Sequence, residues 1–133
     1  MAESDTPHLI AIAVVEHDGR YLIRRRPEGA PLAGYWEFPG GKALSGEPAE
    51  AAAVRECLEE TGLVVRAVGR LVELDHQYDH GALRLSFERC ACVDSAAKPA
   101  GGFEWVDGSA LGDYRFPPAN ETVLRLILSG GLR

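Results

Sequence analysis

An almost unbroken apolar run, LIAIAVV at residues 9–15, most constrains what this chain can fold into. A strand that faces water on one side alternates apolar and polar residues, whereas this run is apolar throughout and rich in branched side chains. It therefore indicates a strand that is covered on both faces. The following Asp18-Gly19 is a strong signal for a two-residue hairpin turn, and YLIRRR at residues 21–26 returns as the partner strand.

Further strands and two helices are predicted downstream of this hairpin. Proline and glycine content predicts a loop at 27–34, and residues 35–42 are predicted to form a short strand that runs into a Gly-Gly turn. A helix is expected at 48–61, with Pro48 as its first residue and Gly62 as its C-terminal cap. Strand-like segments follow at 63–74, 81–93 and 103–106.

The chain ends in a second predicted helix, residues 117–130, with an apolar stripe of Val123, Leu124, Ile127 and Leu128. Strands mixed with two helices favour an α+β fold, an α/β/α sandwich in which a mixed sheet lies between helices. At 133 residues, the length suits one domain spanning 1–133.

Charge and cysteine usage limit the classes of partner. A net charge of −6 argues against a protein that coats polymeric nucleic acid or an anionic membrane, but allows an anionic small ligand if a cation mediates the contact. No apolar stretch approaches the ~18 residues of a membrane span. The N-terminus lacks the pattern of a signal peptide. The three cysteines, Cys57, Cys90 and Cys92, form no CxxC pair, so we expect reduced thiols and a cytoplasmic protein.

The helix expected at 48–61 carries an unusual concentration of like charges. At ~100° per residue, Glu56, Glu59 and Glu60 fall within an arc of roughly 100°. Ala51, Val54 and Leu58 fall on the opposite side, flanked by Cys57, and we expect this apolar face to dock on the sheet. Three clustered carboxylates suit a hard divalent cation, and the absence of His or Cys on that face favours Mg²⁺ or Mn²⁺ over zinc. The alternative is a solvated helix face, with Arg55 and Glu59 forming a weak pair.

The spacing around this helix carries a resemblance to a known family. From Gly41 the chain reads GKALSGEPAEAAAVRECLEETGL, which resembles the signature of the Nudix hydrolases, with Cys57 where a larger aliphatic residue is usual. The resemblance implies that a divalent metal ion assists hydrolysis of a nucleoside diphosphate linked to another group. It implies metal-binding and catalytic roles for Glu56, Glu59 and Glu60, a metal-ligand carbonyl near Gly41, and structural support of the motif by Glu47 and Arg55.

Two further stretches resemble the MutT-like branch of that family: WEFPGGK at 36–42 and FPPAN at 116–120. The resemblance implies that Asn120 reads the edge of an oxidised guanine; the alternative is that Asn120 caps the helix beginning near Pro118. Arg26 is a candidate phosphate or base contact, or else a surface arginine. Further substrate contacts are expected from Glu37, Phe38 and Lys42. Tyr35, Trp36 and Phe38 are candidates to flank the base, with at least one of them packing in the core.

The implied reaction is attack of water on an inner phosphorus of a nucleoside triphosphate, which releases the monophosphate and pyrophosphate. Oxidised purine deoxynucleotides such as 8-oxo-dGTP are the expected substrates. The alternatives are a pyrimidine nucleotide (CTP, dCTP or 5-methyl-dCTP) and a Nudix module that binds nucleotides without turnover. One departure stands out: Pro99 takes the place of a metal-binding loop glutamate of MutT-like enzymes, so either Glu104 or another acid substitutes or one metal site is weaker. Monomer and homodimer both remain open.

Overall fold

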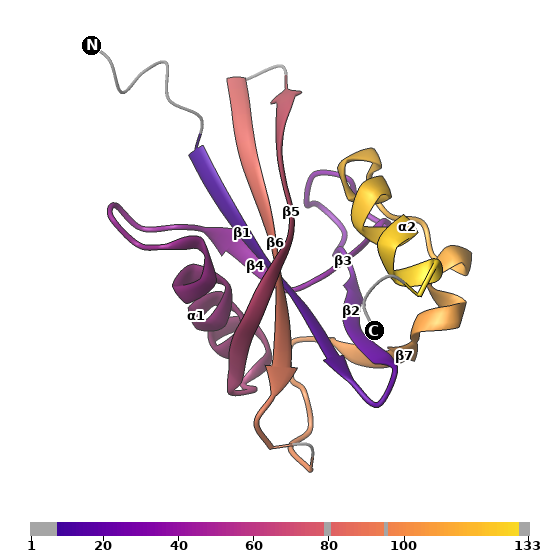
Figure 1. The fold of residues 1–133 in the computed structure, drawn as a ribbon. Coiled ribbons are helices and arrows are strands. Elements are labelled where there is room, and N and C mark those ends of the chain that lie inside the picture. The colour runs from indigo at the N-terminus through magenta and orange to yellow at the C-terminus, as the bar shows by residue number, and fades with distance from the viewer. Residues whose placement is uncertain (1–7, 79–80, 95, 131–133) are drawn as a thin grey trace.

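The computed structural model describes residues 8–78, 81–94 and 96–130 as a mixed sheet with a helix against each face (Figure 1). The predicted sandwich of a mixed sheet between helices is confirmed. The strands are β1 (His8–His17), β2 (Arg20–Arg25), β3 (Trp36–Glu37), β4 (Gly40–Lys42), β5 (Val65–Tyr78), β6 (Gly81–Cys92) and β7 (Glu104–Asp107). The helices are α1 (Ala49–Thr61) and α2 (Glu121–Leu128), with short 3-10 turns η2 (Gly108–Asp113) and η3 (Pro118–Asn120).

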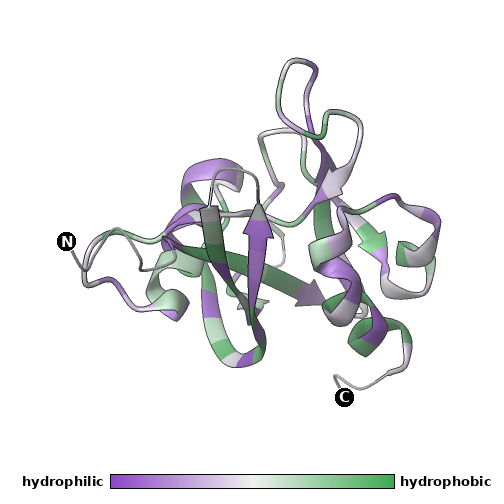
Figure 2. Cartoon of the chain, turned by 90° about the horizontal axis from the view of Figure 1, so that it is seen from above, coloured by the Kyte–Doolittle hydropathy of each residue, from purple (hydrophilic) through white to green (hydrophobic). Residues whose placement is uncertain are grey.

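The central strand β1 is the strand predicted from the apolar run. It pairs in parallel with β6 along one edge, and antiparallel β4 and β2 share its other edge. Ala11, Ala13 and Val15 pack in the core under α1, whereas Val14 packs in the core under α2. Figure 2 shows a strongly hydrophobic strand crossing the middle of the molecule. Both faces of β1 are therefore buried, which explains why its sequence does not alternate.

The turn after β1 also has the predicted chemistry. Asp18 and Gly19 both have positive φ, 52° and 79°, as a type I′ hairpin turn requires. The predicted Gly-Gly turn at 40–41 is wrong, because Gly40, Gly41 and Lys42 form strand β4 against β1. A Cβ on Gly40 would lie 2.5 Å from the carbonyl oxygen of Ala11, so the glycine is needed for close approach between strands rather than for a turn.

Helix α1 begins one residue later than expected, with Pro48 as its N-cap, and ends at Gly62, whose φ is 77°. The predicted packing face is wrong in part: Val54 packs against the core as expected, but Ala51 is exposed. Leu58 is 48% exposed, and the helix instead buries its small side chains Ala49, Ala52, Ala53, Cys57 and Thr61. Small residues allow the helix backbone to approach the sheet closely. The face that carries Glu56 and Glu60 is consequently turned toward β4 rather than away from the sheet.

Strand β5 lies at one end of the strand order and pairs with β6. That pairing shifts register twice, between Ala67 and Gly69 and between Arg70 and Val72. On β6, the buried carboxylate of Glu88 accepts hydrogen bonds from Arg70 Nε at 2.7 Å and from Ser86 Oγ at 2.5 Å. The pair with Glu88 raises the pKa of the Arg70 guanidinium. Arg70 therefore neutralises a carboxylate in the layer between β6 and α1.

The C-terminal helix follows a short 3-10 turn, so the predicted continuous helix from 117 is too long at its start. Val123 and Ile127 are buried as predicted, whereas Leu128 is largely exposed. Burial also raises the pKa of the free Cys90 thiol, to about 12, so this cysteine packs as a small apolar residue. None of the described helices combines the length and apolar character that crossing a membrane requires.

Candidate active site

Glycines of β4 bring α1 into direct contact with the sheet at Glu56. A Cβ on Gly41 would lie 2.4 Å from Glu56 Cδ and 2.5 and 2.6 Å from its two carboxylate oxygens. The carboxylate therefore fills the space that any other residue at position 41 would occupy. The backbone at Gly41 and the Glu56 carboxylate are neighbours, as the resemblance implied for two ligands of one ion.

Glu60 meets the same strand one residue earlier. The Gly40 N–H donates to Glu60 Oε1 at 3.1 Å. Burial raises the pKa of the Glu60 carboxyl; the Gly40 hydrogen bond and the charge of Arg24 oppose that rise, and Glu56 and Glu37 add to it. Glu59, by contrast, has a side chain that is 56% exposed. The structure thus brings Glu56 and Glu60 together against β4 and leaves Glu59 at the solvent edge.

Arg55 links the loop before α1 to the acidic face of the helix. It binds Glu47 in a bidentate fashion, with Nε–Oε2 and Nη2–Oε1 distances of 2.9 Å each. The Arg55 hydrogen bonds, aided by the Leu44 N–H, lower the pKa of the Glu47 carboxyl to about 2. Nη1 of Arg55 also lies 3.0 Å from Glu59 Oε2 and 3.3 Å from Glu56 Oε2. One guanidinium therefore contacts three carboxylates.

This arrangement bears on whether the residues fit a metal ion. Within 8–78, 81–94 and 96–130, no group of three or more His, Cys, Asp or Glu side chains is arranged to hold one. The donor chemistry nonetheless suits Mg²⁺ or Mn²⁺, because three carboxylates and the nearby backbone at Gly41 supply oxygen atoms alone. Glu56 lies against the Gly41 backbone, which is the other expected donor.

A cavity of about 440 Å³ has Gly40 and Gly41 in its wall, whereas Glu56, Glu59 and Glu60 do not line it. Phe38 lines it and stacks on Phe116 with a centroid distance of 5.1 Å. Its apolar floor comes from β1 and β6 and consists of Ile10, Ile12, Leu83, Leu85 and Phe87. The cavity has the shape and lining that suit a flat, partly polar ring next to a charged group.

Polar groups stand at the edge of this cavity. Arg26 Nη1 lies 2.5 Å from Glu37 Oε1, and Arg26 Nε donates to the Pro31 carbonyl at 2.7 Å. Asn120 Nδ2 donates to the Pro117 carbonyl at 3.2 Å, and its side chain makes no capping bond to α2. The capping alternative for Asn120 is therefore wrong. The amide is held with its oxygen directed away from Pro117, as an acceptor.

Not every expected substrate contact lies here. Lys42 is exposed and absent from the cavity wall, and only its carbonyl takes part in the site, as an acceptor for Arg55 at 3.2 Å. Trp36 packs edge-on against Tyr114 at 4.7 Å, and Tyr35 lies under Arg115 at 4.3 Å. Of the three aromatic candidates to flank the base, only Phe38 lines the cavity.

The position of Glu104 shows whether it could replace the missing loop glutamate. Glu104 pairs with Ile23 across β2 and β7, and Ile23 belongs to the core under α2. Directly opposed residues point to the same face of a sheet, so Glu104 lies on the face opposite the Glu60 side. Glu104 is therefore not the substitute, and the loop near Pro99 instead contacts α1 through Ala100, whose N–H donates to the Thr61 carbonyl at 2.8 Å.

Sequence reasoning missed Arg24. It selected Arg26 from the run Arg24-Arg25-Arg26, although residues two apart on a strand share a face. Both guanidinium groups bind the same carboxylate, since Arg24 Nε lies 2.8 Å from Glu37 Oε2. The alternation rule applied to that run would have identified Arg24 as well.

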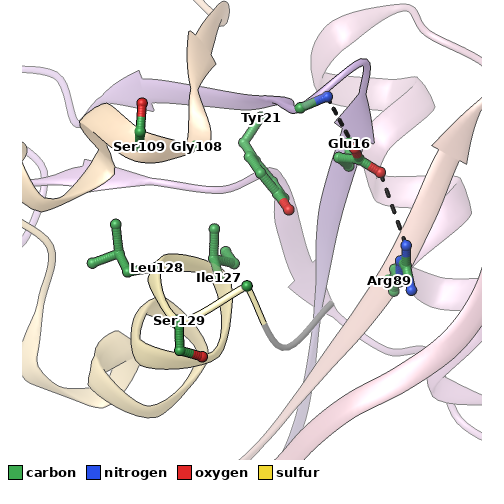
Figure 3. Close-up of a pocket in the computed structure, with 10 residues that line it drawn as sticks. Glu16, Tyr21, Arg89, Gly108, Ser109, Ile127, Leu128 and Ser129 are labelled. Atoms are coloured by element: carbon green, nitrogen blue, oxygen red, sulfur yellow. Dashed lines mark hydrogen bonds and ion pairs between the residues drawn. The ribbon is translucent and has the colours of Figure 1, made fainter. Parts of the chain in front are cut away.

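A second hollow, of about 400 Å³, lies at the C-terminal end of α2 (Figure 3). Its wall includes Tyr21, Ile127, Arg89 and Glu16, with Arg89 Nη2 at 4.0 Å from a Glu16 oxygen. None of the residues predicted for the site lies in its wall. The candidate active site is therefore the cavity beside Gly40 and Gly41.

Comparison with known proteins agrees with this geometry. A NUDIX domain model matches residues 10–126. The chain is 33% identical over 119 residues to the 8-oxo-dGTP diphosphatase of Escherichia coli K12, covering 86% of this chain and 92% of that protein. It is 43% identical to the CTP pyrophosphohydrolase of the same organism over 54 residues, 41% of this chain and 40% of that protein.

A solved structure shows the same fold. The DNA mismatch repair protein MutT of Staphylococcus aureus matches with a TM-score of 0.73 and 26% identity, covering 94% of this chain and 99% of that one. Three observations agree: the motif at Gly41–Leu63, the contacts of Glu56 and Glu60 with β4, and the family match over most of the chain. The chain belongs to the Nudix hydrolase family.

Proposed function

We propose that residues 1–133 act as one Nudix domain that hydrolyses a nucleoside triphosphate to the monophosphate and pyrophosphate with Mg²⁺ or Mn²⁺, and that 8-oxo-dGTP is its preferred substrate. One observation carries this proposal. Glu56 and Glu60 pack on Gly40 and Gly41, and the same two glycines form part of the wall of a cavity of about 440 Å³. A nucleotide with its base in the cavity would direct its phosphates toward the acids.

Each residue then has a part in the reaction. Glu56, Glu59 and Glu60 would hold the ion, with the backbone near Gly41 as a further donor. The bound ion supplies charge neutralisation and a more acidic water molecule. The water oxygen bonds to an inner phosphorus, the bond to the departing pyrophosphate breaks, and the water proton passes to a carboxylate. Glu56 and Glu60 are the two acids placed to accept it. The ion pair between Glu47 and Arg55 would hold the loop before α1 in place against the helix.

Preference for an oxidised purine rests on Asn120. Oxidation at C8 converts N7 of guanine from an acceptor into an N–H donor. The Pro117 bond directs the Asn120 amide oxygen away from that carbonyl, so it can accept this new donor, whereas ordinary guanine would present a repelling lone pair. Sites built around one gained hydrogen bond discriminate strongly. The relative named 8-oxo-dGTP diphosphatase supports the same choice.

A pyrimidine triphosphate, such as CTP, dCTP or 5-methyl-dCTP, is the second candidate. It is favoured by the relative named CTP pyrophosphohydrolase, although that match spans only 41% of this chain. The relative named 8-oxo-dGTP diphosphatase matches 86% of this chain, which makes the pyrimidine candidate the weaker of the two.

The deciding experiment is pyrophosphate release from a panel of ordinary and oxidised nucleotides with Mg²⁺. We expect 8-oxo-dGTP to be hydrolysed well ahead of dGTP and CTP, and Glu60→Gln to lose most of the activity. Glu50→Gln is the matched control, because Glu50 lies on the same helix with its side chain 53% exposed. Equal rates for all bases would remove the role of Asn120. Turnover that survives both Glu60→Gln and a chelator would remove the metal-dependent reaction.

A further inference from the structure

Arg24 binds Glu37, which lines the cavity, and the Gly101 carbonyl, and the proposed reaction gives it no role. We propose that Arg24 binds the phosphate chain of the nucleotide directly. The inference rests on the proposed function, because it takes the base to occupy the cavity walled by Phe38 and Asn120.

Arg24 lies on the face of the sheet that α1 covers. Leu22, two residues earlier on β2, belongs to the core under α1, and side chains two apart on a strand share a face. The Arg24 guanidinium lies 4.7 Å from the ring centroid of Phe103, which is itself buried in that core. The charged group is thus held on an apolar support rather than extended into solvent.

Two hydrogen bonds fix the plane of this guanidinium. Nε lies 2.8 Å from Glu37 Oε2, and Nη1 donates to the Gly101 carbonyl at 3.1 Å. No residue in the described part of the chain takes a hydrogen bond from Nη2. The side chain is 26% exposed. Arg24 is therefore pre-oriented with donors to spare, which is how arginine recognises a phosphate group.

The position of Arg24 is what connects it to the chemistry. Arg24 Nη1 donates to the Gly101 carbonyl at 3.1 Å, which ties the guanidinium to the loop that packs on α1. Gly101, its carbonyl partner, packs on α1, because a Cβ there would lie 2.3 Å from the Glu60 carbonyl oxygen. On the other side, Glu37 joins Arg24 to Arg26, and both Glu37 and Arg26 wall the cavity.

The neighbouring loop supports this assignment. MutT-like enzymes were expected to offer a metal-binding glutamate where this chain has Pro99. The loop offers Arg24 a backbone carbonyl instead, and Glu104 lies on the other face of the sheet. A polyphosphate entering a protein of net charge −6 needs cations around it, and a fixed guanidinium supplies one in this position.

A purely structural role, in which Arg24 only ties the loop near Gly101 to β2, is the competing explanation. The test is calorimetric binding of an unreactive α,β-imido nucleoside triphosphate, compared with the free nucleoside of the same base. Arg24→Gln is expected to weaken binding of the analogue about 10- to 100-fold, the usual range for losing hydrogen bonds to a charged group. Binding of the nucleoside, which has no phosphate, is expected to change less than about twofold.

Arg25→Gln is the matched control, because it removes the same charge from the next residue, whose side chain is exposed on the opposite face. Should Arg24→Gln not fold, Arg24→Lys is judged by the same criterion. A loss confined to the phosphorylated ligand supports the proposal. A loss no greater than that of Arg25→Gln, or an equal loss for nucleoside and analogue, overturns it. Absence of any nucleotide hydrolysis by the wild type would instead overturn the proposed function.

Discussion

Replacing Gly41 by alanine is expected to separate activity from stability. The added Cβ would meet the Glu56 carboxylate at 2.4–2.6 Å, whereas ordinary contacts begin near 3.4 Å. The carboxylate would have to retreat by about 1 Å, and a misplacement of that size can cost about 100-fold in rate. That factor corresponds to about 2.7 kcal/mol of transition-state stabilisation.

The same substitution is expected to leave the folded state almost unharmed. The atoms that must move are the far end of a flexible side chain, and Gly41 does not have a positive φ. Alanine also restricts the unfolded chain, which contributes about 0.4–1 kcal/mol toward stability and offsets the crowding. We therefore expect kcat/KM for pyrophosphate release to fall about 100-fold while the thermal midpoint moves little.

Gly112→Ala is the control for this prediction. Its Cβ would lie 3.7 Å from Leu128 Cδ1, an ordinary contact far from the acids, so activity and stability should both stay near wild type. If Gly41→Ala kept wild-type kcat/KM, the Glu56 carboxylate would not need its place beside the strand. If activity and thermal midpoint fell together, the loss of activity would be explained by destabilisation of the fold.

Three other contacts can be tested by acid, by urea and by base selectivity. The pKa of Glu47 is lowered from 4.5 to about 2, so the contribution of the ionised carboxylate to stability is present above pH 4.5 and is lost as the pH falls toward 2. Over that pH range, the thermal midpoint should fall less steeply for Glu47→Gln than for the wild type. Arg70→Met leaves Glu88 buried with Ser86 as its remaining partner, and should cost about 2–3 kcal/mol in urea unfolding, most of it recovered by adding Glu88→Gln. Asn120→Ala should bring the steady-state rates for 8-oxo-dGTP and dGTP close together, whereas an unchanged ratio would assign base recognition to other residues.

Local signals predicted the elements of the fold well, because they act within a few residues. The uninterrupted apolar character of β1 and the Asp18-Gly19 turn depend on neighbours in sequence, and both are as predicted. The packing face of α1 could not be found in this way. Periodicity selected Ala51, Val54 and Leu58, but only Val54 packs against the core. The close approach of β4 favours Ala52 and Ala53 instead, and Leu58 lies at the surface.

In the candidate site, too, the sequence predicted local features but not the contacts between distant segments. The spacing of the motif located Glu56 and Glu60, but their contacts with Gly40 and Gly41 exist only once helix and strand meet. Glu88 gave no signal at all, because a single acid on a strand resembles a solvent-facing residue and its partner Arg70 lies 18 positions away. Arg24 likewise gains its place through Gly101, which is 77 residues distant.

The two register shifts in β5 have a consequence for how this protein behaves at high concentration. An exposed outer strand of 14 residues would otherwise offer a long, regular row of backbone donors and acceptors to another chain. The irregularities at Ala67–Gly69 and Arg70–Val72 break that row into short lengths, and Arg66 and Asp75 add charge along it. Copies of the molecule are thereby discouraged from adding strands to one another, which protects it against sheet-mediated aggregation.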